Sequence, residues 1–274
     1  MPKEIGKLKS LEILDLESNY LQELPSEIGT LRNLKELNLL DNKLSSLPSE
    51  IGSLLSLERL DLSFNTELRN LPPEFGNLVN LRELILSDNN FDKEYIDQFL
   101  LDISKFTDLR LLELINIGIT ALPSQFACLK KLQDLDLHYN QLSKLPDEFS
   151  QLTSLRNLDI NGNYFEEIPE PIYRLENLET LFAAENDIKF IGKNIKMLRN
   201  LRVLCLGSRG IGLFYESSSG EATNQIKELP LEMLLINSLE ELDLTGNPLP
   251  IPPEILEKTK EPHAIFSAYF GEIT

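Results

Sequence analysis

The stretch "LKSLEILDLESNYLQELPSEIGT", residues 8–30, decides how this chain folds. Its apolar residues, one asparagine and one proline stand in the pattern L-x-x-L-x-x-L-x-L-x-x-N-x-L-x-x-L-P-x-x-I-x-x. The same pattern returns, in phase and at the same length of 23 residues, in residues 31–53, 129–151, 152–174 and 175–197. Self-similarity at a fixed period of this length is the signature of a solenoid.

Five further units follow the pattern less strictly. One residue is added in 54–77, and Ile117 takes the place of the asparagine in 106–128. Two units, 78–105 and 198–235, are longer than the period, and 236–258 is a distorted last unit. The chain of 274 residues therefore consists almost entirely of ten repeats, and we expect a single domain over residues 1–274.

The x-x-L-x-L-x-x part of each unit alternates with period two, as a short strand does when one of its faces is buried. Its leucines point into a core, and successive units stack their strands into a parallel sheet. The prediction is one continuous solenoid with a parallel concave sheet and a mostly irregular outer side. No unit can bury its core alone, so each one depends on its neighbours.

Asparagine and proline mark the two ends of the connection that follows each strand. The asparagine amide can satisfy backbone groups that leave the sheet, so the asparagines are expected to stack in a column. Losing one such buried amide would cost about 1–3 kcal/mol. The proline of Leu-Pro fixes φ at the start of the outer segment. The column comprises Asn19, Asn42, Asn65, Asn89, Asn140, Asn163, Asn186 and Asn247.

This pattern resembles the leucine-rich repeat, and the resemblance covers nearly the whole chain. The spellings "LPSEIG", "LPPEFG" and "LPDEF" are similar to the 23-residue LPxEIG class of Ras-binding scaffolds, Ras-suppressor proteins, Scribble-type polarity proteins, Roco proteins and many bacterial proteins. The resemblance implies an α/β leucine-rich repeat solenoid, or horseshoe. It also implies a protein-binding role.

The two ends of the chain differ from each other. The first residues, "MPKEIGKL", read as the second half of a repeat, which suggests either a fragment or a bare edge. Residues 254–274 break the period and place apolar residues at helical spacing, so a C-terminal helical cap is expected there.

Two interruptions depart from the period. Residues 91–106, "FDKEYIDQFLLDISKF", replace a Leu-Pro segment and predict an amphipathic outer helix. Residues 209–223 are surplus to their repeat, are rich in Gly and Ser, and leave at the exit of a strand, where added length costs little closure entropy. Phe214 and Tyr215 within them either fold back on the rim of the sheet or form a binding lip.

The concave face carries the candidate binding residues. Apolar and aromatic side chains in adjacent outward columns would form a contiguous patch, which is typical of an interaction site. Asp136 and Asp159 should lie side by side and repel each other unless a cation relieves them. They are either ordinary acidic surface or a site for Lys or Arg of a partner. The predicted partner-binding residues are Phe64, Ile85, Glu113, Asp136, His138, Tyr139, Asp159, Phe182, Phe214 and Tyr215.

Within this set, Phe64, Tyr139 and Phe182 are the expected aromatic anchors. The net charge of −18 disfavours nucleic acid, whose binding depends on neutralising phosphates, and favours a basic or mixed partner surface. The same charge could equally serve solubility.

Catalytic chemistry is not expected. Cys128 and Cys205 lie too far from His138 to pair with it, and no phosphate-binding loop is present. Asp134, Asp136 and His138 alternate along one strand, but three residues are too few for a metal site. We therefore predict no catalytic residues, no metal and no cofactor.

The predicted function is a non-catalytic scaffold or adaptor that binds a protein or peptide, such as a small GTPase or a basic surface. The alternatives are the recognition arm of a larger enzyme, a Roco GTPase or an effector ubiquitin ligase, and a secreted bacterial adhesin. Two cysteines and the missing leader favour the cytoplasm, and no apolar run is long enough for a membrane span.

Overall fold

The computed structural model describes residues 1–207 and 224–271. They form two compact units, Met1–Leu132 and Gln133–Thr274, which are described separately here. The insertion expected at 209–223, with Phe214 and Tyr215, lies outside the described residues.

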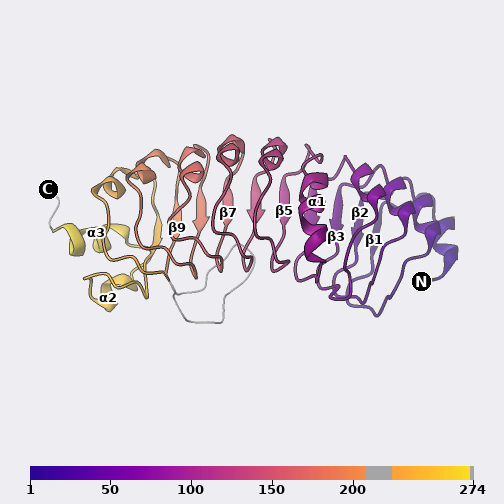
Figure 1. Ribbon diagram of the computed structural model, residues 1–274, viewed down its shortest axis with the longest axis horizontal. Helices are drawn as coiled ribbons and strands as arrows, with labels where there is room; N and C mark the ends of the chain where they lie inside the picture. Colours follow the sequence, from indigo (N-terminus) through magenta and orange to yellow (C-terminus); the bar gives the residue numbers. More distant parts are fainter. Residues whose placement is uncertain (208–223, 272–274) are drawn as a thin grey trace. The chain divides into compact units, whose positions relative to one another are not determined.

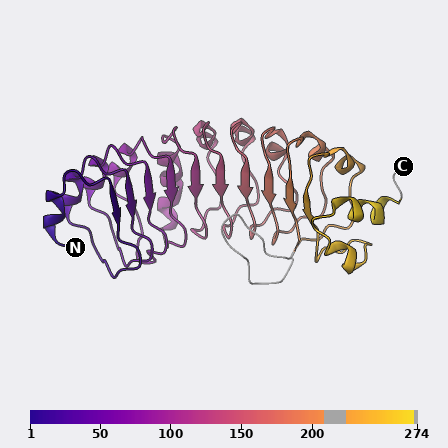
Figure 2. The same cartoon turned by 180° about the vertical axis from the view of Figure 1, so that it is seen from behind.

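Each unit contains a parallel sheet of short strands that follow one another in chain order (Figure 2). Every strand is three residues long. In the first unit they are β1 (Ile13–Asp15), β2 (Glu36–Asn38), β3 (Arg59–Asp61), β4 (Glu83–Ile85) and β5 (Leu111–Glu113). In the second they are β6 (Asp134–Asp136), β7 (Asn157–Asp159), β8 (Thr180–Phe182), β9 (Val203–Cys205) and β10 (Glu241–Asp243). This confirms the predicted fold class, a leucine-rich repeat solenoid.

The repeat fixes the register of the sheet, because the central residue of each strand is a leucine. Leu37 pairs with Leu60 and Leu60 with Leu84, so identical side chains stack in one column. All three are fully buried. Fully burying one such side chain contributes about 1.5–3 kcal/mol, and the columns of leucines form the core.

The outer side is more regular than predicted. It is not mostly irregular, because among the described residues a five-residue 3-10 helix follows the Leu-Pro position in eight of the ten repeats and in the half repeat at residues 1–7 (Figure 1). Pro25 is extended and precedes the first turn, in which the Ile28 amide donates to the Pro25 carbonyl at 3.0 Å. Bonds of this i→i+3 type tighten the chain into short helices. They are η1 (Lys3–Lys7), η2 (Ser26–Thr30), η3 (Ser49–Ser53), η4 (Pro73–Asn77), η5 (Ser124–Cys128), η6 (Asp147–Gln151), η7 (Glu170–Arg174), η8 (Lys193–Met197) and η9 (Leu231–Leu235).

The predicted outer helix is present as α1 (Lys93–Ile103). It lies in front of the strands of the first unit in Figure 1 and behind them in Figure 2. Ile96, Phe99, Leu100 and Ile103 are its buried face. The helix therefore supplies the buried apolar side chains that the Leu-Pro segment supplies in other repeats.

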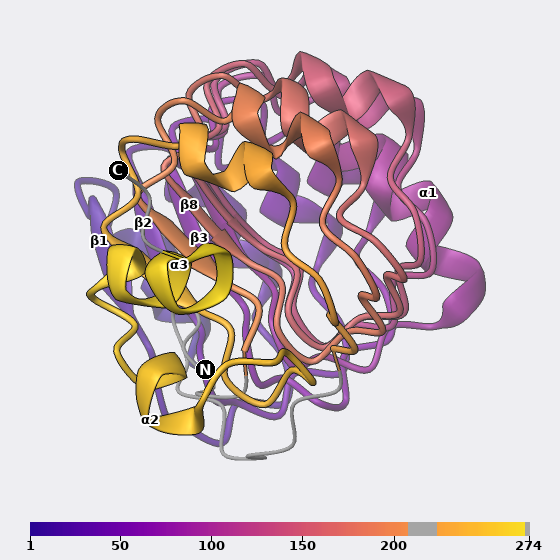
Figure 3. The same cartoon turned by 90° about the vertical axis from the view of Figure 1, so that its left-hand side faces the viewer.

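The predicted C-terminal cap is also present. It consists of α2 (Pro253–Leu256) and α3 (Pro262–Phe270), which lie at the end of the second unit (Figure 3). Between them, the Thr259 carbonyl accepts a hydrogen bond from the Leu242 amide of β10 at 2.8 Å. The cap thus accepts a hydrogen bond from a backbone amide at the edge of the sheet, in the place where the strand of a further repeat would accept it. No helix in the part of the chain described here has the length and apolar character to span a bilayer.

The asparagine column forms a ladder between repeats. In the second unit the Asn163 amide donates to the carbonyls of Leu137 and Ile160, both at 3.1 Å, and its oxygen accepts from the Leu142 amide at 2.9 Å. One side chain thereby joins two neighbouring repeats. Asn224 does the same after the insertion, accepting from the Ile188 amide at 3.0 Å. This confirms that the 198–235 repeat resumes at Asn224.

We expect Asn163→Ala to lower the free energy of unfolding by about 1–3 kcal/mol, because it leaves buried backbone groups of two repeats without partners. Asn177→Ala is the matched control, since Asn177 is exposed and makes one bond, to the Thr153 carbonyl. Its effect should stay below about 0.5 kcal/mol. Urea unfolding followed by circular dichroism measures both, and equal losses in the two variants would contradict a special role for the column.

Candidate functional site

We call the sheet face opposite the leucine core the open face. In each unit it is made by the first and third residues of each strand and by the second and third residues after the strand. The third position holds mostly Asp or Asn, and these side chains have a structural task. Asp136 and Asp159 each use Oδ1 to accept from the backbone amide two residues further on, at 3.0 and 2.9 Å. Asp61 and Asp243 make the same contact. The sequence therefore places a turn cap at this position in most repeats.

Most of the predicted binding residues are buried. Ile85 and Glu113 in the first unit, and Asp136, His138 and Asp159 in the second, are each less than a tenth exposed. Neighbouring strands lie about 4.8 Å apart, so side chains in one column cover one another. The expectation that Asp136 and Asp159 form exposed acidic surface is therefore wrong. Their role in binding stays a prediction.

Phe182 is not available as an exposed anchor either. Its side chain is 6% exposed and packs with Ala184, Cys205 and the half-buried Val203 into an apolar cluster on the open face. Burial raises the pKa of the Cys205 thiol, and the neighbouring Asp243 carboxylate raises it further. This cluster stabilises the face and keeps the thiol protonated.

Phe64 and Tyr139 are exposed, as predicted. Their side chains are 39% and 41% exposed, in the first and second units respectively. Both directly precede a ladder asparagine, at a position with φ of 55° and 54°. That left-handed conformation suits Gly, Asn or Asp, and a bulky residue there stores about 1–3 kcal/mol of strain. Other repeats place smaller or polar residues at this position: Ser18, Asp41, Asp88, Asn116, Gly162, Glu185 and Gly246.

The Tyr139 ring is held in place by two neighbours. It lies over Gly162 so closely that a Cβ on Gly162 would overlap the ring. The His138 ring meets it edge-on, with 4.8 Å between centroids. Tyr139 and Gly162 occupy the same position in successive repeats. Because Gly162 has no side chain, it leaves space for the Tyr139 ring of the preceding repeat. The sequence contained this signal as Tyr-Asn followed by Gly-Asn, but only the structure shows that the two positions are in contact.

The open face is also strongly acidic. Carboxylates recur in three of the four positions and stand once, as Glu17, in the fourth, whereas Arg59 is the single Lys or Arg among the described residues there. Arg59 forms an ion pair with Glu83. The face as described therefore presents aromatic groups in negative surroundings.

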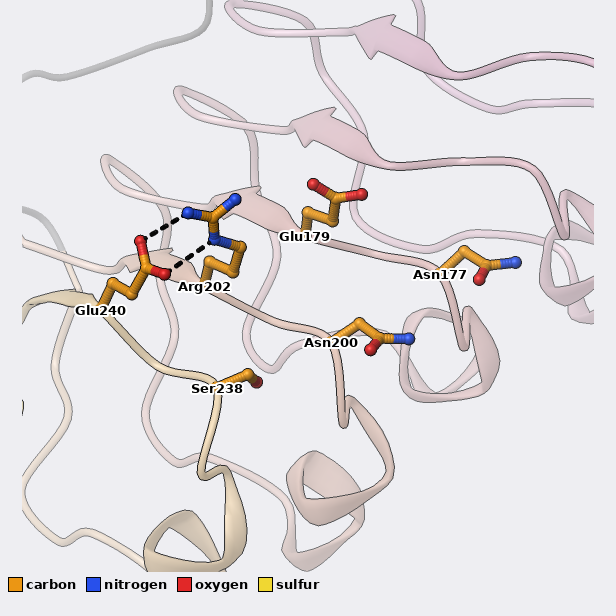
Figure 4. A pocket seen from close by; sticks show the side chains of 6 residues that line it. All are labelled: Asn177, Glu179, Asn200, Arg202, Ser238 and Glu240. Carbon is orange, nitrogen blue, oxygen red and sulfur yellow. Dashed lines mark hydrogen bonds and ion pairs between the residues drawn. The ribbon is translucent and has the colours of Figure 1, made fainter.

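A polar hollow lies near the strand entrances of the second unit (Figure 4). Its charged groups bind one another: Arg202 Nε and Nη2 donate to the two Glu240 oxygens at 3.0 and 2.9 Å. Asn177 and Asn200 bind carbonyls of the preceding repeats. Since these groups serve the stacking of repeats, the hollow is a weaker candidate than the open face.

Comparison with known families agrees with this architecture. The chain matches the family described as leucine-rich repeat region over residues 1–105 and 95–216, and the family described as Leucine Rich Repeat over residues 238–258. The sequence matches no curated protein.

Solved structures resemble the chain over most of its length. A leucine-rich repeat protein of Leptospira interrogans is 32% identical, with a TM-score of 0.62 over 100% of this chain and 74% of that one. The ectodomain of the Arabidopsis thaliana receptor kinase GASSHO1/SCHENGEN3, solved with CASPARIAN STRIP INTEGRITY FACTOR 2, is 28% identical, with a TM-score of 0.64. The plant peptide hormone receptor RGFR1, solved with RGF2, is 28% identical, with a TM-score of 0.62. Both matches cover 91% of this chain, but only 31% and 46% of the respective receptors.

We expect Gly162→Ala to destabilise the protein by about 1–3 kcal/mol, because the new methyl group overlaps the Tyr139 ring and φ is +60°. Gly76→Ala is the control, since a Cβ there meets no atom within 4 Å and no positive φ is involved. Urea unfolding compares the two. If Gly162→Ala were as stable as Gly76→Ala, the packing of Tyr139 described above would be wrong.

The two thiols should react differently. Cys128 is exposed, whereas Cys205 is buried with its pKa raised, so at neutral pH it stays in the unreactive protonated form. Ellman's reagent should titrate one thiol per native chain and two in urea. Equal, fast reaction of both thiols in the native protein would show that the Cys205 cluster is open to solvent.

Proposed function

This chain belongs to the leucine-rich repeat family, and we propose that it is a non-catalytic module that binds a basic protein or peptide on its open face. The observation that carries the proposal is the placement of Phe64 and Tyr139. Each exposes an aromatic ring from a backbone position that disfavours bulky residues. Strain of this kind persists where it serves a function.

The charge of the open face supports a basic partner. Asp41 and Asp88 occupy the position of Phe64 in the two neighbouring repeats, and Arg59 is the single Lys or Arg among the described members of the face. Aromatic anchors within a polar rim are typical of binding hot spots, and opposite charge speeds association. A small GTPase with a basic surface and an extended basic peptide both fit this description.

The similar proteins support recognition of a protein or peptide. The two plant receptors were solved with the partners named above, and RGFR1 is described as a peptide hormone receptor. Both receptors are much longer than the matched region, which favours as a second candidate a recognition arm within a larger protein. A scaffold in the cytoplasm, with a signalling role, remains our first proposal.

The test is selection of peptides from a random display library on the immobilised full-length chain. Selected peptides should be rich in Lys or Arg, and their affinity should fall as salt rises. The double variant Phe64→Asn and Tyr139→Asn should bind them at least about tenfold more weakly, which is about 1.4 kcal/mol. Asparagine tolerates the left-handed backbone, so the variant should keep the fold.

Phe190→Asn is the control, because Phe190 is half exposed but lies beside the Leu-Pro segment rather than on the open face. It should bind the peptides as wild type does. Fluorescence anisotropy gives each Kd, and circular dichroism checks folding. If the double variant binds as tightly as wild type, the site lies elsewhere.

A further inference from the structure

Three potential metal ligands meet on the open face of the second unit. Asp136 ends β6 and pairs in register with Asp159 at the end of β7. His138 follows two residues after Asp136. One ligand atom from each of the three side chains lies within 4.8 Å of the other two, and all three residues are buried. Two strands therefore bring together two carboxylates and one imidazole.

One carboxylate oxygen in this cluster has no partner. Asp136 is fully buried, and its Oδ1 already accepts from the His138 backbone amide and faces His138 Nδ1 at 2.8 Å. Its Oδ2 is buried but finds no hydrogen-bond donor among the described residues. Leaving a charged oxygen in this state is costly, more so than for a neutral group. A cation placed beside Oδ2 removes that cost.

The charges of the cluster also fit a divalent ion. Two adjacent carboxylates in a column repel each other when buried. A divalent cation between the two side chains would offset this repulsion. The turn-cap role of the column does not explain the cluster, because Asp243 fills that role with its Oδ1 alone, accepting from the Thr245 amide and hydroxyl at 2.9 and 2.7 Å.

We propose that Asp136, His138 and Asp159 bind a divalent transition-metal ion of the zinc type. Imidazole together with carboxylate suits this class, whereas Ca²⁺ and Mg²⁺ prefer an all-oxygen set. Ligand atoms around a four-coordinate Zn²⁺ lie about 3.3 Å apart, at metal distances of about 2.0–2.2 Å. In the structure these atoms lie within 4.8 Å of one another, so metal binding would draw them closer together.

This proposal departs from the sequence-based expectation of no metal. The sequence pattern had placed Asp134 with Asp136 and His138, whereas the structure places Asp159 there. Asp134 stands on the same strand as Asp136, but its carboxylate accepts from Asn157 Nδ2 at 2.6 Å. The neighbouring strand supplies Asp159 instead. Three protein ligands leave the fourth position to water or to a group of a bound molecule. The proposal holds whether or not the open face binds a protein.

The test is calorimetric titration of the full-length chain with ZnCl₂ at pH 7.5, after removal of metal with a chelator. Wild type should show one tight site per chain, with Ca²⁺ and Mg²⁺ binding at least about a hundredfold more weakly. Asp136→Asn should weaken zinc at least about tenfold. Its amide oxygen still accepts from the His138 amide, so the turn keeps its cap.

Asp243→Asn is the matched control, because Asp243 is equally buried and caps the equivalent turn without a histidine. It should bind zinc as wild type does. A second readout is long-range ¹H–¹⁵N NMR of the two histidines, in which zinc should shift the ring nitrogens of His138 and not those of His263. Equal zinc affinity in wild type and Asp136→Asn, equal affinity for Ca²⁺, or an unshifted His138 would each overturn the proposal.

Discussion

Every repeat of this protein is completed by its neighbours, and the asparagine ladder is the clearest expression of that constraint. Asn163 ties its own turn to the strand exit and to the start of the outer segment of the repeat before it. The bonds are buried, so they must be made within the protein. For this reason the asparagine is present again after the long insertion, as Asn224. For the same reason the Thr259 carbonyl of the cap accepts a hydrogen bond from the last strand, where no further repeat follows in the sheet.

The same stacking determines what the open face can offer. Strands about 4.8 Å apart bury most of the side chains at the third strand position, whatever their polarity. Aspartate is tolerated at this position because it caps the turn, and Phe182 is tolerated because it packs against Cys205. Side chains escape burial at the left-handed position after the strand, from which Phe64 and Tyr139 project. The residues proposed to bind a partner are thus the ones that carry the backbone strain.

Acidity and burial together give the second unit its most unusual feature. Asp136 and Asp159 are held in place as turn caps, which forces two carboxylates into one column beside His138. A structural rule of the repeat thereby creates a concentration of negative charge that the repeat itself does not need. Such a cluster is suited to a cation, either an ion or a basic group of a partner.

The sequence by itself determined the repeat, the strands, the ladder, the outer helix and the cap, because each depends on periodic local patterns that every repeat restates. It also identified Phe64 and Tyr139 as exposed aromatic residues. It could not show that Phe182 and Asp136 are buried, or that Asp159 rather than Asp134 joins His138. Those outcomes depend on which side chains from neighbouring repeats share the limited space between strands, and only the tertiary structure decides that.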